Sequence, residues 1–129
     1  MAKTRIDDAI GMAAVREWGA AYDEGGATAA KAVARAVRAT AVRYTLQALV
    51  DRAPGSTLEV RVPPFGAVQC VEGPGHTRGT PPNVVEMDAE TWLALATGRA
   101  DWAEERGAAR VRASGTRADV SGFLPVVRG

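Results

Sequence analysis

The sequence contains one thiol and one imidazole, and they lie close together along the chain. Cys70 and His76 are the single cysteine and the single histidine. A thiol beside an imidazole is the arrangement of a cysteine nucleophile with its general base. Cys70 falls inside a predicted strand, however, and no helix N-terminus precedes it to stabilise a thiolate. A buried cysteine in that setting behaves as a small hydrophobic side chain, so the sequence favours a protein without catalytic residues. A thiol-dependent enzyme is the least favoured alternative.

The same two residues are the best metal ligands that the sequence offers. One cysteine and one histidine fall short of the usual ligand set of zinc, and no patterned carboxylates complete it. We therefore predict neither a metal nor another cofactor.

A glycine- and proline-rich stretch, residues 73–83, carries polar side chains that could bind a ligand. His76, Arg78 and Asn83 lie there, and loops on a rigid scaffold often carry function. A guanidinium pairs well with a carboxylate or a phosphate. Two interpretations stay open: an ordinary connector with solvated side chains, or a polar contact of His76 and Arg78 with the headgroup of a ligand.

The elements that position these residues begin with two predicted helices. Residues 7–22 show apolar side chains at helical spacing, with Thr4 and Asp7 as candidate caps. Residues 28–52 contain no glycine or proline and carry a wide apolar face that includes Val37 and Ala41. We expect this second helix to be the strongest in the chain and to pack on a large surface.

Strands and short helices follow. Alternation of apolar and polar residues predicts strands over 58–62, 67–72, 83–87 and 110–114, with a short edge strand through 76–78. Asp88 caps a predicted helix over 89–97 that Gly98 ends. Asp101 and Glu104 form a capping box for a helix that Gly107 ends, and a final helix carries Phe123 and Leu124. A three-stranded meander followed by a crossover implies one mixed sheet, with the helices on one face.

Composition limits the class of protein. A chain of 129 residues with 47% hydrophobic residues fits one globular domain, and a net charge of +1 gives no reason to expect a nucleic acid partner. The single cysteine suits a reducing compartment. Together with the lack of a secretory signal pattern and of a long apolar run, it predicts a cytoplasmic protein.

One stretch of positive charge stands out. Lys31, Arg35 and Arg38 fall on one face of the predicted second helix, and no acid occurs between Glu24 and Asp51. A solvated face is the usual meaning of such charges. Transient docking on an anionic membrane is the alternative.

The C-terminal half resembles the sterol carrier protein family. The run Asp88-Ala-Glu-Thr-Trp-Leu-Ala-Leu-Ala-Thr-Gly98 is similar to that family's acidic cap, leucine-rich helix and Thr-Gly stop, and Arg110-Val-Arg-Ala-Ser-Gly115 to its last strand. The runs from Val62 to Cys70 and from Gly75 to Glu86 resemble an actinobacterial branch, the bacterial sterol carrier orthologues. The resemblance covers residues 28 to 127. The chain lacks the peroxisomal signal that ends the classical members.

The resemblance implies an α+β fold with one five-stranded mixed sheet, helices over one face, and an apolar tunnel between the two layers. It implies binding of a fatty acid, an acyl-CoA or a sterol-like lipid. We expect residues 1–27 to be an N-terminal helical extension of a single globular unit whose family domain is 28–129. The predicted ligand-binding residues are Val37, Ala41, Trp92, Leu95, Trp102, Phe123 and Leu124.

Two further hypotheses stay open beside the lipid carrier. A fold without a cavity could serve as a protein-interaction or homodimerisation module, with an exposed apolar patch as its mark. An enzyme acting through Cys70 is the third.

Overall fold

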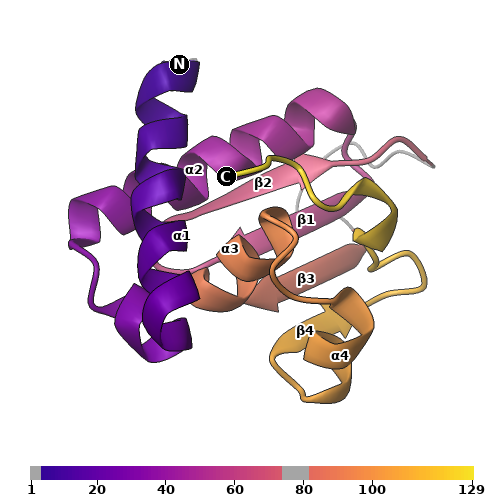
Figure 1. The fold of residues 1–129 in the computed structure, drawn as a ribbon. Coiled ribbons are helices and arrows are strands. Elements are labelled where there is room, and N and C mark those ends of the chain that lie inside the picture. The colour runs from indigo at the N-terminus through magenta and orange to yellow at the C-terminus, as the bar shows by residue number, and fades with distance from the viewer. Residues whose placement is uncertain (1–3, 74–81) are drawn as a thin grey trace.

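A mixed four-stranded sheet forms one layer of the structure, a computed structural model that describes residues 4–73 and 82–129 (Figure 1). The strand order is β2-β1-β3-β4. β1 (Leu58–Val62) pairs antiparallel with β2 (Gly66–Cys70) and parallel with β3 (Asn83–Met87), and β4 (Val111–Ser114) runs antiparallel to β3. The predicted α+β class and the mixed sheet are confirmed.

Alternation along the strands separates a buried face of the sheet from an outer one. Leu58, Val60 and Val62 are fully buried, whereas Glu59 and Arg61 between them are half-buried on the opposite face. Period-two alternation places every second side chain on the same face of a strand. The inner face therefore forms one wall of the hydrophobic core.

Two features of the predicted sheet are wrong. The first three strands do not form a meander, because β3 lies beside β1 and parallel to it rather than beside β2. Parallel neighbours need a long connection, and β1 and β3 are joined by residues 63–82, which include β2. The described residues form four strands rather than five, and the edge strand predicted over 76–78 lies outside them.

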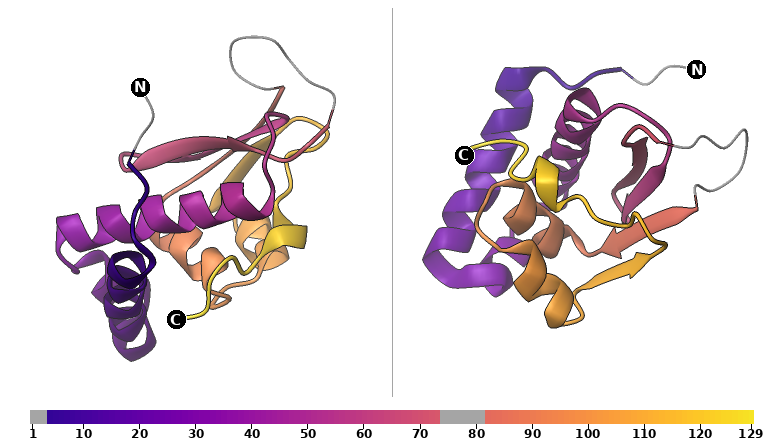
Figure 2. Two further views of the ribbon diagram at one scale, coloured as in Figure 1. Left: turned by 90° about the horizontal axis from the view of Figure 1, so that it is seen from above. Right: turned by 90° about the vertical axis from the view of Figure 1, so that its right-hand side faces the viewer.

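The helices cover the inner face of the sheet, as predicted, and they do so in two layers. α2 (Arg35–Arg52) lies on the sheet, and α1 (Asp8–Lys31) crosses α2 on the side away from the strands (Figure 2, left). α3 (Ala89–Ala96) packs beside both helices, and α4 (Trp102–Gly107) lies against β4. α1 adds the fully buried Val15 and Trp18 to the same core that the sheet, α2 and α3 share.

The predicted helix over 28–52 is interrupted. Residues 27–31 continue α1 beyond a kink at Gly26, whose φ is 70°, and α2 starts only at Arg35. The break at 32–34 contains no glycine or proline, so local propensity does not explain it. Crossing of α1 over α2 requires the chain to reverse there, and this tertiary packing outweighs the helix propensity of alanine. Consequently Lys31 lies on a different helix from Arg35 and Arg38.

The caps Asp88 and Gly98 are placed as predicted, but α1 continues to Lys31 past its predicted end at Tyr22, and the last predicted helix is shortened. Asp88 accepts a hydrogen bond from the Thr91 amide (2.8 Å), and Gly98 has a φ of 80°. The predicted final helix is only the 3-10 turn η1 (Ser121–Phe123). Gly122 disfavours a longer helix, and Pro125 biases the residue before it towards extended backbone.

Candidate functional site

A groove of about 730 Å3 runs between α2, the edge strand β2 and the extended residues that lead into α1. It opens beside β2, which is one of the two edge strands of the sheet formed by the described residues. The groove is lined by Thr4, Arg5, Ile6, Thr40, Arg43, Leu46, Gln47, Val50, Asp51, Phe65, Gly66, Ala67 and Val68.

Apolar side chains form the floor of the groove. Leu46 and Phe65 are only 1% and 4% exposed, since both also belong to the main core. Val50, one helical turn after Leu46, and Val68 on the inner face of β2 are half-buried and pack against the same core. The helix spacing i, i+4 and the strand register thus bring an apolar strip of α2 opposite an apolar strip of β2.

The N-terminal wall of the groove is held by paired polar contacts. The Gln47 carboxamide accepts a hydrogen bond from the Ile6 amide (2.9 Å) and donates one to the Ile6 carbonyl (3.0 Å). Arg5 makes a bidentate pair with Asp51, at 3.1 and 2.7 Å, and this pair holds the pKa of the Asp51 carboxyl below its usual value. The wall is therefore anchored by two neutral hydrogen bonds and one exposed ion pair.

Arginines gather at the opposite end of the groove, around Phe65. Arg43 donates from Nε to the Phe65 carbonyl (2.8 Å). The guanidinium carbons of Arg35 and Arg38 each lie 5.2 Å from the centre of the Phe65 ring, within the range of a cation–π contact. Arg38 is also paired with Glu90 at 2.8 Å, so its charge is compensated.

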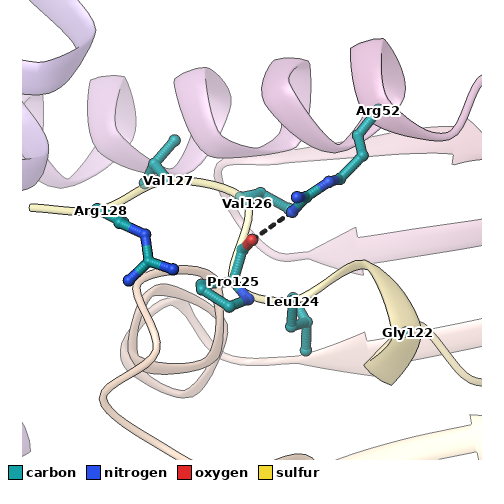
Figure 3. A pocket seen from close by; sticks show the side chains of 7 residues that line it. All are labelled: Arg52, Gly122, Leu124, Pro125, Val126, Val127 and Arg128. Atoms are coloured by element: carbon teal, nitrogen blue, oxygen red, sulfur yellow. Dashed lines mark hydrogen bonds between the residues drawn. The ribbon is translucent and has the colours of Figure 1, made fainter.

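A second pocket, of about 480 Å3, lies where the C-terminal segment passes the end of α2. Arg52 of α2 donates to the carbonyls of Phe123 and Pro125, and Val126 and Val127 donate from their amides to Ala96. Figure 3 shows Arg52 reaching the Pro125 carbonyl across this pocket. Backbone groups and two arginines border it, so it offers little apolar surface to a ligand.

The seven predicted ligand-binding residues lie mainly in the packed core. Ala41, Trp92 and Leu95 are almost completely buried, Trp102 is 9% exposed, and Val37 and Phe123 are half-buried. Trp92 donates from Nε1 to the Thr45 hydroxyl (2.8 Å). Leu124 alone of the seven lines one of the pockets described above. The structure does not bring the seven together around an open tunnel, and their role in binding stays a prediction.

The residues of the polar loop have separate places. His76 and Arg78 lie outside the described residues. Asn83 is buried and donates to the Thr57 carbonyl (2.9 Å) while it accepts a hydrogen bond from the Arg117 amide (2.9 Å). The nitrogen and the oxygen of its carboxamide therefore both form hydrogen bonds with the backbone, which indicates a structural role for Asn83.

Cys70 closes β2 and is fully buried in the core. Burial raises the pKa of its thiol from 9.0 to about 11, because the surrounding apolar atoms disfavour a thiolate. A thiol with this pKa is protonated at neutral pH and is a poor nucleophile. This finding agrees with the inert role predicted for Cys70.

The raised pKa of Cys70 gives a pH dependence of stability with a defined sign. The unfolded chain loses the Cys70 proton near pH 9 and the folded chain only near pH 11. The free energy of unfolding should therefore fall by roughly 2 kcal/mol between these values. Urea titrations of the wild-type protein and of Cys70→Ala between pH 8 and 11 test this. Equal slopes for the two proteins would contradict it.

Two further properties concern the described residues as a whole. They contain no group of three or more His, Cys, Asp and Glu side chains placed to hold a metal ion. No helix in 4–73 and 82–129 combines the length and the apolar character needed to cross a bilayer.

The described residues thus form a one-sided α+β fold with a groove between helix and sheet and a buried, protonated thiol. A family model described as "Bacterial SCP ortholog" matches residues 34–126, and the chain belongs to this family of bacterial sterol carrier protein orthologues. No curated protein matches the chain. The match includes α2, the sheet and α3, and it starts after α1.

Sequence reasoning missed most of the groove. Gln47 and Asp51 lie on the predicted second helix, but nothing in the sequence indicates that residues 4–6 fold back on them. Phe65 stands in a Pro-Pro-Phe-Gly sequence, whose local signals predict a turn and no binding role. The missing signal is long-range: more than thirty residues separate Ile6 from Gln47.

Proposed function

We propose that this protein binds and transfers an apolar, chain-like ligand without catalysing a reaction, and that the ligand lies in the groove between α2 and β2. The sterol carrier family, to which the chain belongs, is generally a family of non-catalytic carriers. The single observation that supports this location is a groove of about 730 Å3 with a continuous apolar floor.

Size and chemistry of the groove suit such a ligand. Pockets that hold small molecules usually measure roughly 300–1,000 Å3 and are mostly apolar with a few polar groups. Leu46, Phe65 and Val68 would contact the chain of the ligand, and each buried methylene would contribute about 0.8 kcal/mol. The rim, with Thr40 and Gln47, can hydrogen-bond a polar end.

The N-terminal wall suggests how a ligand is loaded and released. Neutral hydrogen bonds contribute about 1 kcal/mol each and exposed ion pairs less than that. Residues 4–6 can therefore leave Gln47 and Asp51 without unfolding of the core. In this proposal the wall opens for loading, and the ligand passes to or from a membrane surface in the cytoplasm.

A binding experiment with two groove variants tests the proposal. Thr40→Trp adds a large side chain at the rim, and Val68→Asp places a carboxylate in the apolar floor. We expect the wild-type protein to bind one long-chain alcohol, fatty acid, acyl-CoA or sterol per chain in native mass spectrometry and calorimetry. Each variant should weaken that binding at least about tenfold, equivalent to about 1.4 kcal/mol.

A matched control keeps the test specific. Ala103→Trp places the same side chain on the exposed surface of α4, away from the groove, and should bind like the wild-type protein. Thermal melting of each variant separates lost binding from lost folding. Failure of the folded wild-type protein to bind any of the four ligand classes, or unchanged binding by both groove variants, would overturn the proposal.

The other predicted partners stay predictions. A transient contact with anionic membranes and a homodimer are both compatible with a carrier. An interaction module would need an exposed apolar patch, and among the described residues Ile10, at 62% exposure, is the one large exposed hydrophobic side chain. The lipid carrier is therefore the better supported of the two hypotheses.

A further inference from the structure

We propose that the Phe65 end of the groove is a subsite for an anionic headgroup, a carboxylate or a phosphate, and that Arg43 is the residue that selects it. This inference rests on the proposed function. It goes further because it fixes the orientation of the ligand and excludes a neutral headgroup as the preferred one.

The first argument is the uneven distribution of charge along the groove. Three charged side chains line it: Arg5, Asp51 and Arg43. Arg5 and Asp51 neutralise each other at the N-terminal end. Arg43 forms no ion pair with any residue of 4–73 or 82–129. One end of the groove is therefore neutral and the other is cationic.

The second argument is that Arg43 is held in place while its charge stays uncompensated. The Phe65 carbonyl accepts from Nε, at 2.8 Å. Within the described residues, neither terminal nitrogen of the guanidinium donates a hydrogen bond to protein. A guanidinium fixed through Nε presents its two terminal nitrogens as a preorganised pair of donors, which matches the two oxygens of a carboxylate or phosphate.

The third argument concerns the surroundings of Arg43. Arg35 lies over the ring of the same Phe65 and adds a second positive charge to this end of the groove. Arg38 does not add to it, because Glu90 compensates its charge. Thr40 lines the groove one helical turn before Arg43 and offers a hydroxyl on the same face of α2. An anionic head placed here leaves the chain of the ligand to extend over Leu46 towards Val50 and Ile6.

The test compares headgroups on one chain. A long-chain alcohol, the carboxylic acid of equal chain length and the corresponding alkyl phosphate are titrated by calorimetry, below their micelle concentrations, into the wild-type protein and into Arg43→Gln, Arg43→Lys and Arg35→Gln. We expect the wild-type protein to bind the two anions about tenfold more tightly than the alcohol. Arg43→Gln should remove this preference, with a larger loss of affinity for the anions than for the alcohol. Arg43→Lys should retain only part of it, because an ammonium lacks the paired donors of a guanidinium. Arg35→Gln should reduce it about threefold.

Arg106→Gln is the matched control and should keep the wild-type preference. Arg106 is an exposed arginine on α4 that is remote from the groove.

Equal affinity of the wild-type protein for alcohol and anions would overturn the subsite while leaving the proposed function intact. A uniform loss for all three ligands in Arg43→Gln would overturn it too, because Arg43 would then act only on the fold of the groove. Displacement of the alkyl phosphate by equimolar inorganic phosphate would overturn the headgroup role in favour of a site for a free anion. Absence of binding by the alcohol and both anions would overturn the proposed function itself.

Discussion

Replacement of Glu90 by alanine is expected to lower the free energy of unfolding by about 3 kcal/mol. Glu90 belongs to α3, its side chain is 8% exposed, and it accepts hydrogen bonds from Arg38 of α2 at 3.1 and 2.8 Å. It also accepts from Nε1 of the fully buried Trp18 of α1, at 3.3 Å. One carboxylate thus joins three helices, and its removal leaves a poorly solvated guanidinium and an indole N–H without their partner. Urea unfolding measures the loss.

An exposed pair with the same geometry provides the control. Arg5 and Asp51 also form a bidentate pair, but their side chains are 65% and 52% exposed. Asp51→Ala should therefore cost less than about 1 kcal/mol, and added salt should shrink that cost further. A similar loss for Asp51→Ala and Glu90→Ala would contradict the view that burial determines the effect.

A double variant separates the two causes of the Glu90 effect. In Arg38→Met/Glu90→Gln the buried charge at position 38 is gone, and the carboxamide at position 90 can still accept a hydrogen bond from Trp18. Replacing a buried ion pair by groups of similar size is often close to neutral. We expect this protein to be more stable than Glu90→Ala by at least about 1 kcal/mol. If it is less stable, uncompensated charge is not the main cause of the loss.

Local signals were sufficient to predict much of the fold. The alternation in 58–62 and 83–87, the caps Asp88 and Asp101, and the stop at Gly98 are encoded within a few residues of the elements that they define. Those predictions are confirmed. The break at 32–34 and the parallel pairing of β1 with β3 depend instead on which surfaces meet after folding. No residue near either position signals them.

The groove shows the same limit more clearly. Apolar spacing over 28–52 predicted a wide apolar face, and the structure places Leu46 of this face, together with Val50, beside an open groove. Whether an apolar side chain borders a void or a neighbour is decided by packing. The family resemblance therefore led to the prediction of Trp92 and Phe123, rather than Leu46 and Val50, as ligand-binding residues. Arg43 and Gln47 acquire their positions from Phe65 and Ile6, which are distant in sequence.

Two parts of the chain contribute differently to the groove. The floor and the cationic end belong to α2 and β2, within the family match over 34–126. The N-terminal wall, residues 4–6, lies before that match. The family match thus covers the floor and the cationic end of the groove but not its N-terminal wall, whose position depends on how α1 is placed in this chain.

The position of α1 leads to the second large effect, at the point where α1 crosses α2. Gly11 of α1 lies so close to Tyr44 of α2 that a Cβ atom at position 11 would fall 2.1 and 2.2 Å from the ring atoms Cδ1 and Cγ. The ring cannot easily move, because Tyr44 is 7% exposed and its hydroxyl donates to Asp8 at 2.9 Å. Gly11→Ala should therefore destabilise the protein by about 2 kcal/mol, although alanine favours a helix over glycine by about 0.5–1 kcal/mol.

Two comparisons establish that the contact with Tyr44 causes the loss. Gly107→Ala has the opposite expectation, a small gain, because nothing lies within 4 Å of a Cβ atom at that helical position. In a Tyr44→Leu background the cost of Gly11→Ala should fall below half of its value, and an unchanged cost would contradict the steric explanation.

Because residues 4–6 lead directly into α1, a shift of α1 also draws Ile6 away from Gln47. Faster hydrogen exchange at the Ile6 amide in Gly11→Ala would show that the helix crossing positions the wall of the groove.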